Sequence, residues 1–256
     1  MTTIGIIPVR MGSSRFPGKP LAKICGITMV EHVYRRSALS KNLDDVYVAT
    51  CDDDIKEAVE AFGGKVIMTK DTHERCSDRV AEALEKIEEQ LGKEVDVVAM
   101  IQGDEPMIFP EMLDEGIAPF AHDPEVVVTN LMAPLKSKEE HEDPNEVKVV
   151  VDLNNNALYF SREAIPSRKK GVEEVPMLKQ VCIISFRRDF LLKYQSLEPT
   201  ALEKIESVDM MRVLEHGYKV KMVPTSHETY SVDTLEDLRK VEELMKHDVL
   251  MKEYEK

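Results

Sequence analysis

The sequence predicts an α/β fold with a mostly parallel central sheet, flanking helices and a smaller mixed sheet or lobe. Over about the first hundred residues, short apolar runs alternate with helical patterns. This alternation is typical of parallel strands joined by helices. Between about residues 126 and 186, strand-like runs instead follow one another with turns between them. We therefore expect a single domain over residues 1–256 with an inserted lobe roughly within residues 125–200.

The N-terminal elements are expected to alternate between strand and helix. The run Ile4–Val9 is apolar and ends near a glycine turn, which predicts a buried strand. Gly63-Gly64 is a usual C-terminal stop for the helix before it. The remaining elements are helices at about Met29–Leu39, Ile55–Phe62 and Ser77–Leu91, and strands at Asp45–Thr50, Lys65–Met68 and Val95–Ile101. The third helix is expected to place Val80, Leu84, Ile87 and Leu91 on one face.

The middle and C-terminal parts are expected to contain the mixed sheet and two further helices. Predicted strands are Val126–Leu131, Val147–Val151, Ala157–Ser161 and Gln180–Phe186. Predicted helices are Thr200–His216 and Thr234–Lys246.

The composition is typical of a globular protein, with 43% hydrophobic and 32% charged residues. The net charge of −14 argues against non-specific nucleic-acid binding, which needs a basic surface. The four cysteines form no CxxC motif, which favours reduced thiols over disulfides or a zinc site. The sequence shows neither a long apolar run nor a signal-peptide pattern. We therefore expect a cytoplasmic protein without nucleic-acid or membrane partners.

A basic loop follows the first predicted strand. It contains three cations and several small residues, namely Arg10, Gly12, Ser13, Ser14, Arg15, Gly18 and Lys19. Glycine lets backbone N–H groups approach an anion, and Lys and Arg neutralise it, so the loop suits phosphates. It is not a Walker A loop, because Lys19 is followed by Pro20 instead of a hydroxyl residue. The alternative interpretation is a solvated, basic surface turn.

Two aspartates are candidates for holding a metal ion. Asp104 follows a predicted central strand within Gln102–Pro106, and Asp233 precedes a predicted helix. Open α/β sheets bind ligands at the carboxyl ends of their strands, and carboxylates there suit Mg²⁺ bound to phosphate oxygens. Each acid has an alternative interpretation as a cap of the helix that follows it. For Asp233, the local sequence favours the cap.

A series of segments in a fixed order now indicates a family. The segments are IIPVRMGSSRFPGKPL, IQGDEPMI, NEVKVVVD, ALYFSREAIP, LEKIE, MRVL and SVDTLEDL. Together they resemble the 3-deoxy-manno-octulosonate (Kdo) cytidylyltransferases, and the likeness extends from Ile4 to about Glu243. The patterns RxxSxRxPGKPL and QGDEP are specific in combination, whereas either alone indicates only a sugar nucleotidyltransferase.

The resemblance implies a nucleotide-diphospho-sugar transferase-like fold and a role in lipopolysaccharide biosynthesis. In the implied Mg²⁺-dependent reaction, the anomeric hydroxyl of an acidic sugar attacks the α-phosphate of CTP, giving a CMP-sugar and pyrophosphate. We also expect a homodimer.

The resemblance also assigns roles to individual residues. Arg10 and Lys19 would neutralise the triphosphate and the departing pyrophosphate, with help from Arg15, and Asp104 and Asp233 would bind the metal. Ser77 and Arg79 would lie near the cytosine and favour CTP over purine triphosphates. The residues expected near the acceptor sugar are Gln102, Arg162, Gln180 and Asp209.

The sequence departs from the family pattern at three places that we assign to the acceptor. Arg75-Cys76 stands where Ser-Gly is usual, Gln180 where a histidine is usual, and Asp209-Met210 where Glu-Gln is usual. Gln180 gives up any cationic assistance, and Met210 would leave a sugar hydroxyl without a partner. We therefore expect Kdo to be a poor acceptor compared with a related acidic compound.

Three other functions are compatible with parts of the sequence. A cytidylyltransferase for a modified octulosonate or a phosphonate is the alternative within the same class. A catalytically silent nucleotide-binding protein is disfavoured, because a scaffold has no need of two acids directed at one metal. A dinucleotide-dependent oxidoreductase is disfavoured because no GxGxxG follows the first predicted strand.

Overall fold

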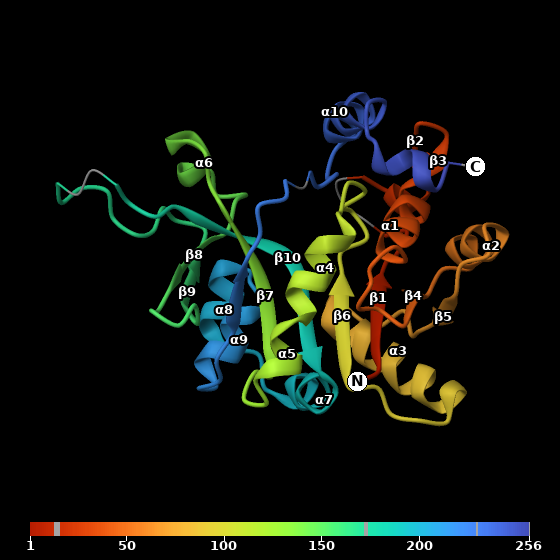
Figure 1. Ribbon diagram of the computed structural model, residues 1–256, viewed down its shortest axis with the longest axis horizontal. Coiled ribbons are helices and arrows are strands. Elements are labelled where there is room, and N and C mark those ends of the chain that lie inside the picture. The colour runs from red at the N-terminus through yellow and green to blue at the C-terminus, as the bar shows by residue number, and fades with distance from the viewer. Residues whose placement is uncertain (13–15, 172–173, 229, 256) are drawn as a thin grey trace. The chain divides into compact units, whose positions relative to one another are not determined.

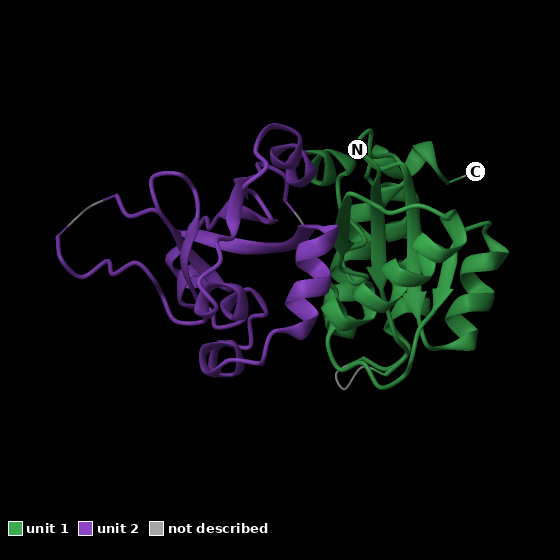
Figure 2. Cartoon of the chain, turned by 90° about the horizontal axis from the view of Figure 1, so that it is seen from below, with its two compact units in different colours: residues 1–114, 229–256 green, residues 115–228 purple. Residues whose placement is uncertain are grey.

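A computed structural model describes residues 1–12, 16–171, 174–228 and 230–255 (Figure 1). The chain forms two compact units, one of residues 1–114 with 229–256 and one of residues 115–228 (Figure 2). The second unit interrupts the first along the sequence. The range predicted for the inserted lobe, residues 125–200, falls inside this second unit. That the whole chain is a single domain stays a prediction.

The first unit contains a parallel sheet with the strand order β6-β1-β4-β5. These strands are β1 (Thr3–Pro8), β4 (Asp45–Thr50), β5 (Val66–Met68) and β6 (Val97–Ile101). Every residue of β1 is buried, as expected for a strand covered on both faces. The predicted α/β class, with a mostly parallel sheet, is confirmed.

Helices flank this sheet. They are α1 (Met29–Ser37), α2 (Asp53–Ala61) and α3 (Cys76–Leu91), with α4 (Pro110–Ile117) crossing into the second unit. Helix α10 (Leu235–Met245) instead contacts residues Lys23–Ile24, outside the parallel sheet. Along α3, Val80, Leu84 and Ile87 are buried as predicted, but Leu91 is 40% exposed. Leu91 is the last helical residue before Gly92, whose φ of 65° ends the helix, so it falls outside the packed face.

Four short elements of the first unit were not expected from the sequence pattern. They are a 3₁₀ turn at Lys19–Leu21, the strands β2 (Lys23–Ile24) and β3 (Ile27–Thr28), and a 3₁₀ turn at Leu250–Glu253. The strands β2 and β3 pair as an antiparallel hairpin through Cys25 and Gly26, which both have positive φ. Elements this short carry no readable hydrophobic period.

An apolar cluster supports this part of the first unit. Its buried members are Ile24, Met29, Val232, Val241, Met245, Met251 and Tyr254. Phe16 and Tyr230 pack against it. The cluster therefore joins the segments next to Lys19 and Asp233 to α10 and to the C-terminal residues.

Buried polar groups also tie α1 to the C-terminal segment. Tyr254 Oη lies 2.9 Å from His32 Nδ1 and accepts a hydrogen bond from Arg36 Nε at 3.0 Å. His32 Nε2 lies 2.8 Å from the carbonyl oxygen of Ile24, and Arg36 forms an ion pair with Asp248. Because a carbonyl only accepts, His32 Nε2 carries the proton and Nδ1 accepts from the Tyr254 hydroxyl.

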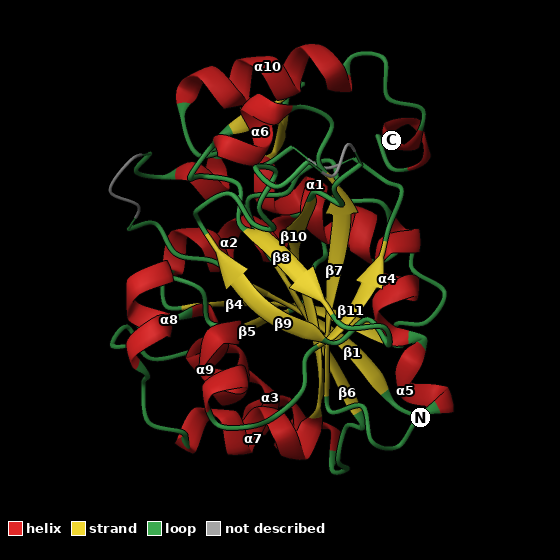
Figure 3. Ribbon diagram, turned by 90° about the vertical axis from the view of Figure 1, so that its left-hand side faces the viewer, coloured by secondary structure: helices red, strands yellow, loops and turns green. Residues whose placement is uncertain are grey.

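The second unit contains a mixed sheet (Figure 3). Its strands are β7 (Val128–Pro134), β8 (Lys148–Val151), β9 (Ala157–Ser161), β10 (Leu178–Arg187) and β11 (Lys221–Pro224). Strand β7 pairs with β11 in parallel and with β10 antiparallel, and β8 pairs antiparallel with both β10 and β9. The predicted smaller mixed sheet is present, with β11 as an addition.

The second unit contains short helices, of which the sequence predicted only the region Thr200–His216. They are α5 (Pro119–His122), α6 (Lys138–Glu142), α7 (Arg188–Ser196), α8 (Ala201–Glu206) and α9 (Met210–Glu215). The prediction of one helix over Thr200–His216 is wrong, because Ser207 takes a left-handed backbone with φ 52°. A buried ion pair between Glu203 on α8 and Arg212 on α9, at 2.6 Å, holds the two helices together. Among the described residues, no helix has the length and apolar character needed to cross a membrane.

Candidate active site

Three of the predicted site residues, Arg10, Gln102 and Asp104, follow strands of the parallel sheet. Strands β1 and β6 are parallel neighbours, so their carboxyl ends lie at the same edge of the sheet. Arg10 follows β1 and is exposed, while Gln102 and Asp104 follow β6 and are half-buried. This is the edge at which open α/β sheets bind ligands. Arg15, the third predicted cation, lies outside the described residues.

A glycine allows the segment of Asp104 to approach the end of β1. A Cβ added at Gly103 would lie 2.2 Å from Val9 Cγ1 and 3.4 Å from the Pro8 carbonyl oxygen. A side chain at residue 103 therefore cannot fit unless the Val9 side chain or the loop after β6 moves. The glycine of the QGD segment is thus explained by its close packing against the Val9 side chain.

Lys19 is placed by the turn that ends the basic loop. Gly18 has a φ of 75° and donates its N–H to the Met11 carbonyl at 3.1 Å, which closes the loop. At the other side of the loop, the Met11 N–H donates to Asp52 Oδ2 at 2.8 Å. Lys19 then begins the 3₁₀ turn, with Pro20 buried behind it.

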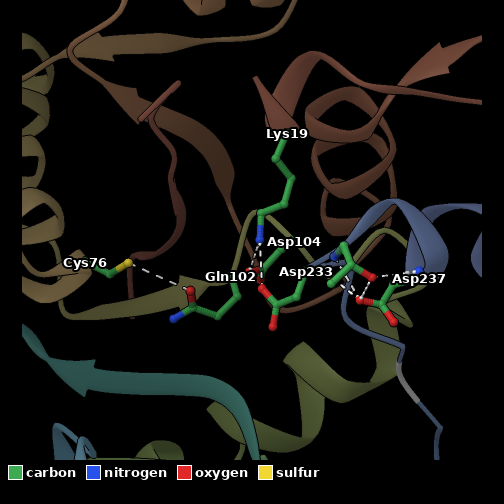
Figure 4. Close-up of polar contacts among 7 residues, drawn as sticks. Lys19, Cys76, Gln102, Asp104, Asp233 and Asp237 are labelled. Carbon is green, nitrogen blue, oxygen red and sulfur yellow. Dashed lines mark hydrogen bonds and ion pairs between the residues drawn. The ribbon is translucent and has the colours of Figure 1, made fainter. Parts of the chain in front are cut away.

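The Lys19 ammonium bridges the two predicted metal ligands (Figure 4). Lys19 Nζ lies 2.8 Å from Asp104 Oδ2 and 3.2 Å from Asp233 Oδ1. The side chains of Asp104 and Asp233 are 29% and 33% exposed, whereas that of Lys19 is 13% exposed. The Val232 N–H also donates to the Asp104 carbonyl at 2.9 Å, so the backbones of the two acidic segments are joined. The structure therefore brings Lys19, Asp104 and Asp233 together.

The two carboxylates keep Lys19 charged. Burial by itself would lower the pKa of the Lys19 ammonium, because desolvation penalises the charged form. The charges and hydrogen bonds of Asp104 and Asp233 oppose this effect, and the pKa of Lys19 is raised above its ordinary value.

The structure gives the helix-cap role to neighbours of Asp233. Thr234 is the N-cap of α10, where its hydroxyl accepts from the Asp237 N–H at 3.2 Å. Asp237 Oδ2 accepts in return from the N–H groups of Thr234 and Asp233, at 2.8 and 3.1 Å. Asp104 does not cap a helix either, since α4 begins only at Pro110. Both cap interpretations are therefore wrong, because neither carboxylate serves as a helix N-cap.

The base-side residues Ser77 and Arg79 are buried on the first turns of α3. Ser77 is 1% exposed and Arg79 is 3% exposed. Arg79 Nη1 donates to the Thr69 hydroxyl and to the Lys70 carbonyl. Ser77 Oγ and Arg79 Nη2 have no hydrogen-bond partner within the part of the chain that the structure describes. Unpaired buried groups cost about 1–3 kcal/mol each, so a polar ligand that reached them would be stabilised.

Gln102 contacts one of the residues at which the sequence departs from the family pattern. The Cys76 thiol, at the start of α3, lies 3.8 Å from Gln102 Oε1 (Figure 4). A glycine at this position would offer no such contact. The thiol therefore influences how the Gln102 amide is presented.

In the second unit, Arg162 is held by the end of α8. Its Nε donates to the Glu206 carbonyl at 2.7 Å, and its Nη1 donates to the Pro144 carbonyl at 2.8 Å. The Glu206 carboxylate accepts from the Arg162 N–H at 2.8 Å and from the Tyr159 hydroxyl at 3.0 Å. Sequence reasoning missed Glu206, although it is the last residue of the LEKIE segment.

Gln180 is oriented by a buried asparagine that sequence reasoning also missed. Gln180 Nε2 donates to Asn130 Oδ1 at 2.6 Å. Asn130 Nδ2 donates to the Val181 carbonyl at 2.7 Å, and this contact lies beside the bulge between Val181 and Ile184 in β10. The Asn130 side-chain amide donates its hydrogens to backbone carbonyls, so its oxygen is the atom that faces Gln180. Gln180 Oε1 is thereby directed away from Asn130 as a hydrogen-bond acceptor.

Asp209 and Met210 lie at the start of α9. Asp209 is half-buried, and its carbonyl accepts from the Tyr194 hydroxyl at 3.2 Å. Met210 is 0% exposed and belongs to the core. The expectation that Met210 would face a sugar hydroxyl is therefore wrong.

Fold and site together define a nucleotidyltransferase, in which a basic loop and Asp104 follow strands of a parallel sheet and Asp233 lies before α10. Residues 4–222 match the family model described as "Cytidylyltransferase", and the chain belongs to this family.

Within the family, the chain resembles Kdo cytidylyltransferases, as the motifs indicated. It is 42% identical to the 3-deoxy-manno-octulosonate cytidylyltransferase of Geobacter sulfurreducens, over 96% of this chain and all of that one. It is also 42% identical to the 8-amino-3,8-dideoxy-manno-octulosonate cytidylyltransferase of Shewanella baltica, over 95% and 98% of the chains. A solved CMP:2-keto-3-deoxy-manno-octonic acid synthetase complexed with CTP superposes with a TM-score of 0.90, at 38% identity over 96% and 99% of the chains.

Proposed function

We propose that this chain is a Mg²⁺-dependent cytidylyltransferase that transfers CMP from CTP to the anomeric hydroxyl of a Kdo-like acidic sugar and releases pyrophosphate. The observation that carries the proposal is the convergence of Lys19, Asp104 and Asp233 at one point, within 3.2 Å. The names of the relatives support a Kdo-type acceptor. Such a product would serve lipopolysaccharide biosynthesis.

The reaction requires mainly positioning and charge neutralisation. The sugar oxygen forms a bond to the α-phosphorus of CTP, and the bond from that phosphorus to the pyrophosphate oxygen breaks. Negative charge then accumulates on the pyrophosphate, where Arg10 and Lys19 are the cations that would stabilise it. The proton of the attacking sugar hydroxyl passes to solvent water in the same step.

The Asp104 and Asp233 carboxylates fit Mg²⁺. They are partly exposed oxygen ligands, and Mg²⁺ is commonly bound through one or two carboxylates, substrate phosphates and waters. No group of three or more His, Cys, Asp or Glu side chains suited to a metal occurs among the described residues. When bound, the ion would polarise the α-phosphate and lower the pKa of the attacking hydroxyl.

Pyrophosphate release measured with CTP, Mg²⁺ and Kdo tests the proposal. We expect release that depends on both the acceptor and the metal, with CMP-Kdo as the second product. CTP binding without pyrophosphate release, for every acidic sugar tried, would instead indicate a nucleotide-binding protein without catalytic activity.

A second candidate is a cytidylyltransferase for a modified octulosonate that carries an additional hydrogen-bond donor. The Gln180–Asn130 pair favours it, because it fixes an acceptor oxygen where the family pattern has a histidine. The 8-amino acceptor named for the Shewanella baltica relative is one such compound. A higher kcat/KM for the 8-amino sugar than for Kdo would support this candidate, and the reverse order would support Kdo.

A further inference from the structure

Lys19 occupies the position between the two acids that a divalent cation would need. One nitrogen contacts both Asp104 Oδ2, at 2.8 Å, and Asp233 Oδ1, at 3.2 Å (Figure 4). All three residues belong to the first unit, and Lys19 is the least exposed of them. The same two carboxylates are the ligands of the metal in the proposed function, on which this inference rests.

We infer that Lys19 is the resident counter-ion of the Asp104–Asp233 pair, and that it competes with the divalent cation for these two carboxylates. In the enzyme without nucleotide, Lys19 holds the acids together and keeps the affinity for the metal low. When the triphosphate binds, the Lys19 side chain moves, and its ammonium contacts the phosphates instead of the carboxylates. The two carboxylates then bind the metal that accompanies the nucleotide.

The Lys19 ammonium and Mg²⁺ cannot occupy the position between the Asp104 and Asp233 oxygens at the same time, because there is room for only one of them. Mg²⁺ binds oxygens at about 2.0–2.1 Å, so oxygens that share one ion must approach more closely than two oxygens that share an ammonium. Nζ lies between those oxygens and would have to leave.

Charge acts in the same direction as space. An ammonium that stayed beside the ion would repel it in a partly buried location where water screens weakly. Departure of Lys19 is favourable only when another anion accepts it, and the triphosphate is that anion in the proposed function.

The test is the affinity of the free enzyme for Mn²⁺, measured by electron paramagnetic resonance without nucleotide. Lys19→Met removes the competing charge but keeps much of the side-chain volume, and we expect it to bind Mn²⁺ at least about tenfold more tightly than the wild type. Lys19→Gln serves as a second neutral variant if Lys19→Met does not fold. The matched control is Lys23→Met, which removes one charge from an exposed side chain of the neighbouring strand β2.

The gain should vanish when Asp104→Asn is added to Lys19→Met, because the tight site then lacks one ligand. Equal or weaker Mn²⁺ binding by both neutral variants, or an equal gain in Lys23→Met, would overturn the inference. Pyrophosphate release by the wild type is measured separately. If the wild type releases pyrophosphate but Lys19→Met binds Mn²⁺ no more tightly, only the inference is rejected. If Lys19→Met binds Mn²⁺ more tightly but the wild type releases no pyrophosphate, the inference is supported and the proposed function is rejected.

Discussion

At the scale of single residues, Asp104 and Asp233 should affect catalysis, whereas Thr234, the N-cap of α10, should affect stability. We expect Asp104→Asn and Asp233→Asn each to lower kcat by at least about a hundredfold, because charge stabilisation of the phosphoryl group is lost. Thr234→Ala should instead lower the free energy of unfolding by about 1 kcal/mol, because α10 loses its N-cap, with little effect on kcat. Steady-state kinetics and denaturant unfolding of the three variants give both quantities.

The opposite pattern would reject this assignment. If Asp233→Asn kept its turnover while Thr234→Ala lost it, Asp233 would not be a metal ligand. Sequence reasoning identified Asp233 as a candidate but favoured its role as a cap. The overlooked signal was local, since Thr234-x-x-Asp237 is itself a capping-box pattern.

Other residues of the site had no local signal. Asn130 orients Gln180 only because β7 and β10 pair beside a bulge, and Glu206 holds Arg162 only because α8 ends near β9. These contacts depend on tertiary pairing, which periodicity does not encode. Met210 was misassigned because a family position does not reveal whether a side chain is buried.

At the scale of elements, Gly103 sets how closely the loop after β6 approaches β1. We expect Gly103→Ala to lower the free energy of unfolding by about 1–3 kcal/mol, because the added methyl overlaps Val9 Cγ1. It should also lower kcat, since Asp104 is the next residue. Chemical denaturation and kinetics provide the measurements.

A second substitution tests whether the overlap with Val9 causes the loss of stability in Gly103→Ala. Val9→Ala removes the overlapping methyl, so Gly103→Ala should cost less stability in a Val9→Ala background than in the wild type. Val9→Ala alone is the control for the lost packing. Identical costs in the two backgrounds would show that close packing against Val9 is not the reason for glycine.

The connection between α1 and the C-terminal segment predicts a pH dependence of stability. Burial lowers the pKa of His32 to about 4, whereas an unfolded histidine titrates near pH 6.5. Because the unfolded chain binds the proton more tightly, acid favours unfolding between these values. The contribution is fully present above about pH 6.5, and up to about 3 kcal/mol is lost as the pH falls toward 4.

Urea unfolding of wild type and His32→Gln across this pH range measures the effect. The stability difference between the two proteins should shrink as the pH falls, because only the wild type loses the contribution of the neutral imidazole. His122→Gln, which removes an exposed histidine from α5, should follow the wild type. A pH-independent difference between wild type and His32→Gln would contradict the lowered pKa of His32.

At the scale of the whole molecule, the parallel sheet was predicted more completely than the second unit. Strands β1, β4, β5 and β6 are buried apolar runs, and the helices between them indicate that they pair in parallel. In contrast, β11 is only four residues long and begins with a lysine, so its pairing with β7 had no sequence signal. The break between α8 and α9 occurs at Ser207, where a left-handed backbone without glycine or proline gives no warning.

Nucleotide binding should raise the stability of the whole molecule, and its selectivity tests the base-side residues. A ligand that binds only the folded chain at 100 times its Kd stabilises by about 2.7 kcal/mol. For a chain of this size, that corresponds to a Tm increase of roughly 5–10 °C. We expect this increase with CTP and Mg²⁺ but a clearly smaller one with ATP or GTP, because the resemblance places Ser77 and Arg79, which carry unpaired buried polar atoms, next to the cytosine. Differential scanning calorimetry of wild type and Ser77→Ala gives the comparison, and an equal increase with a purine triphosphate would contradict the placement of the cytosine.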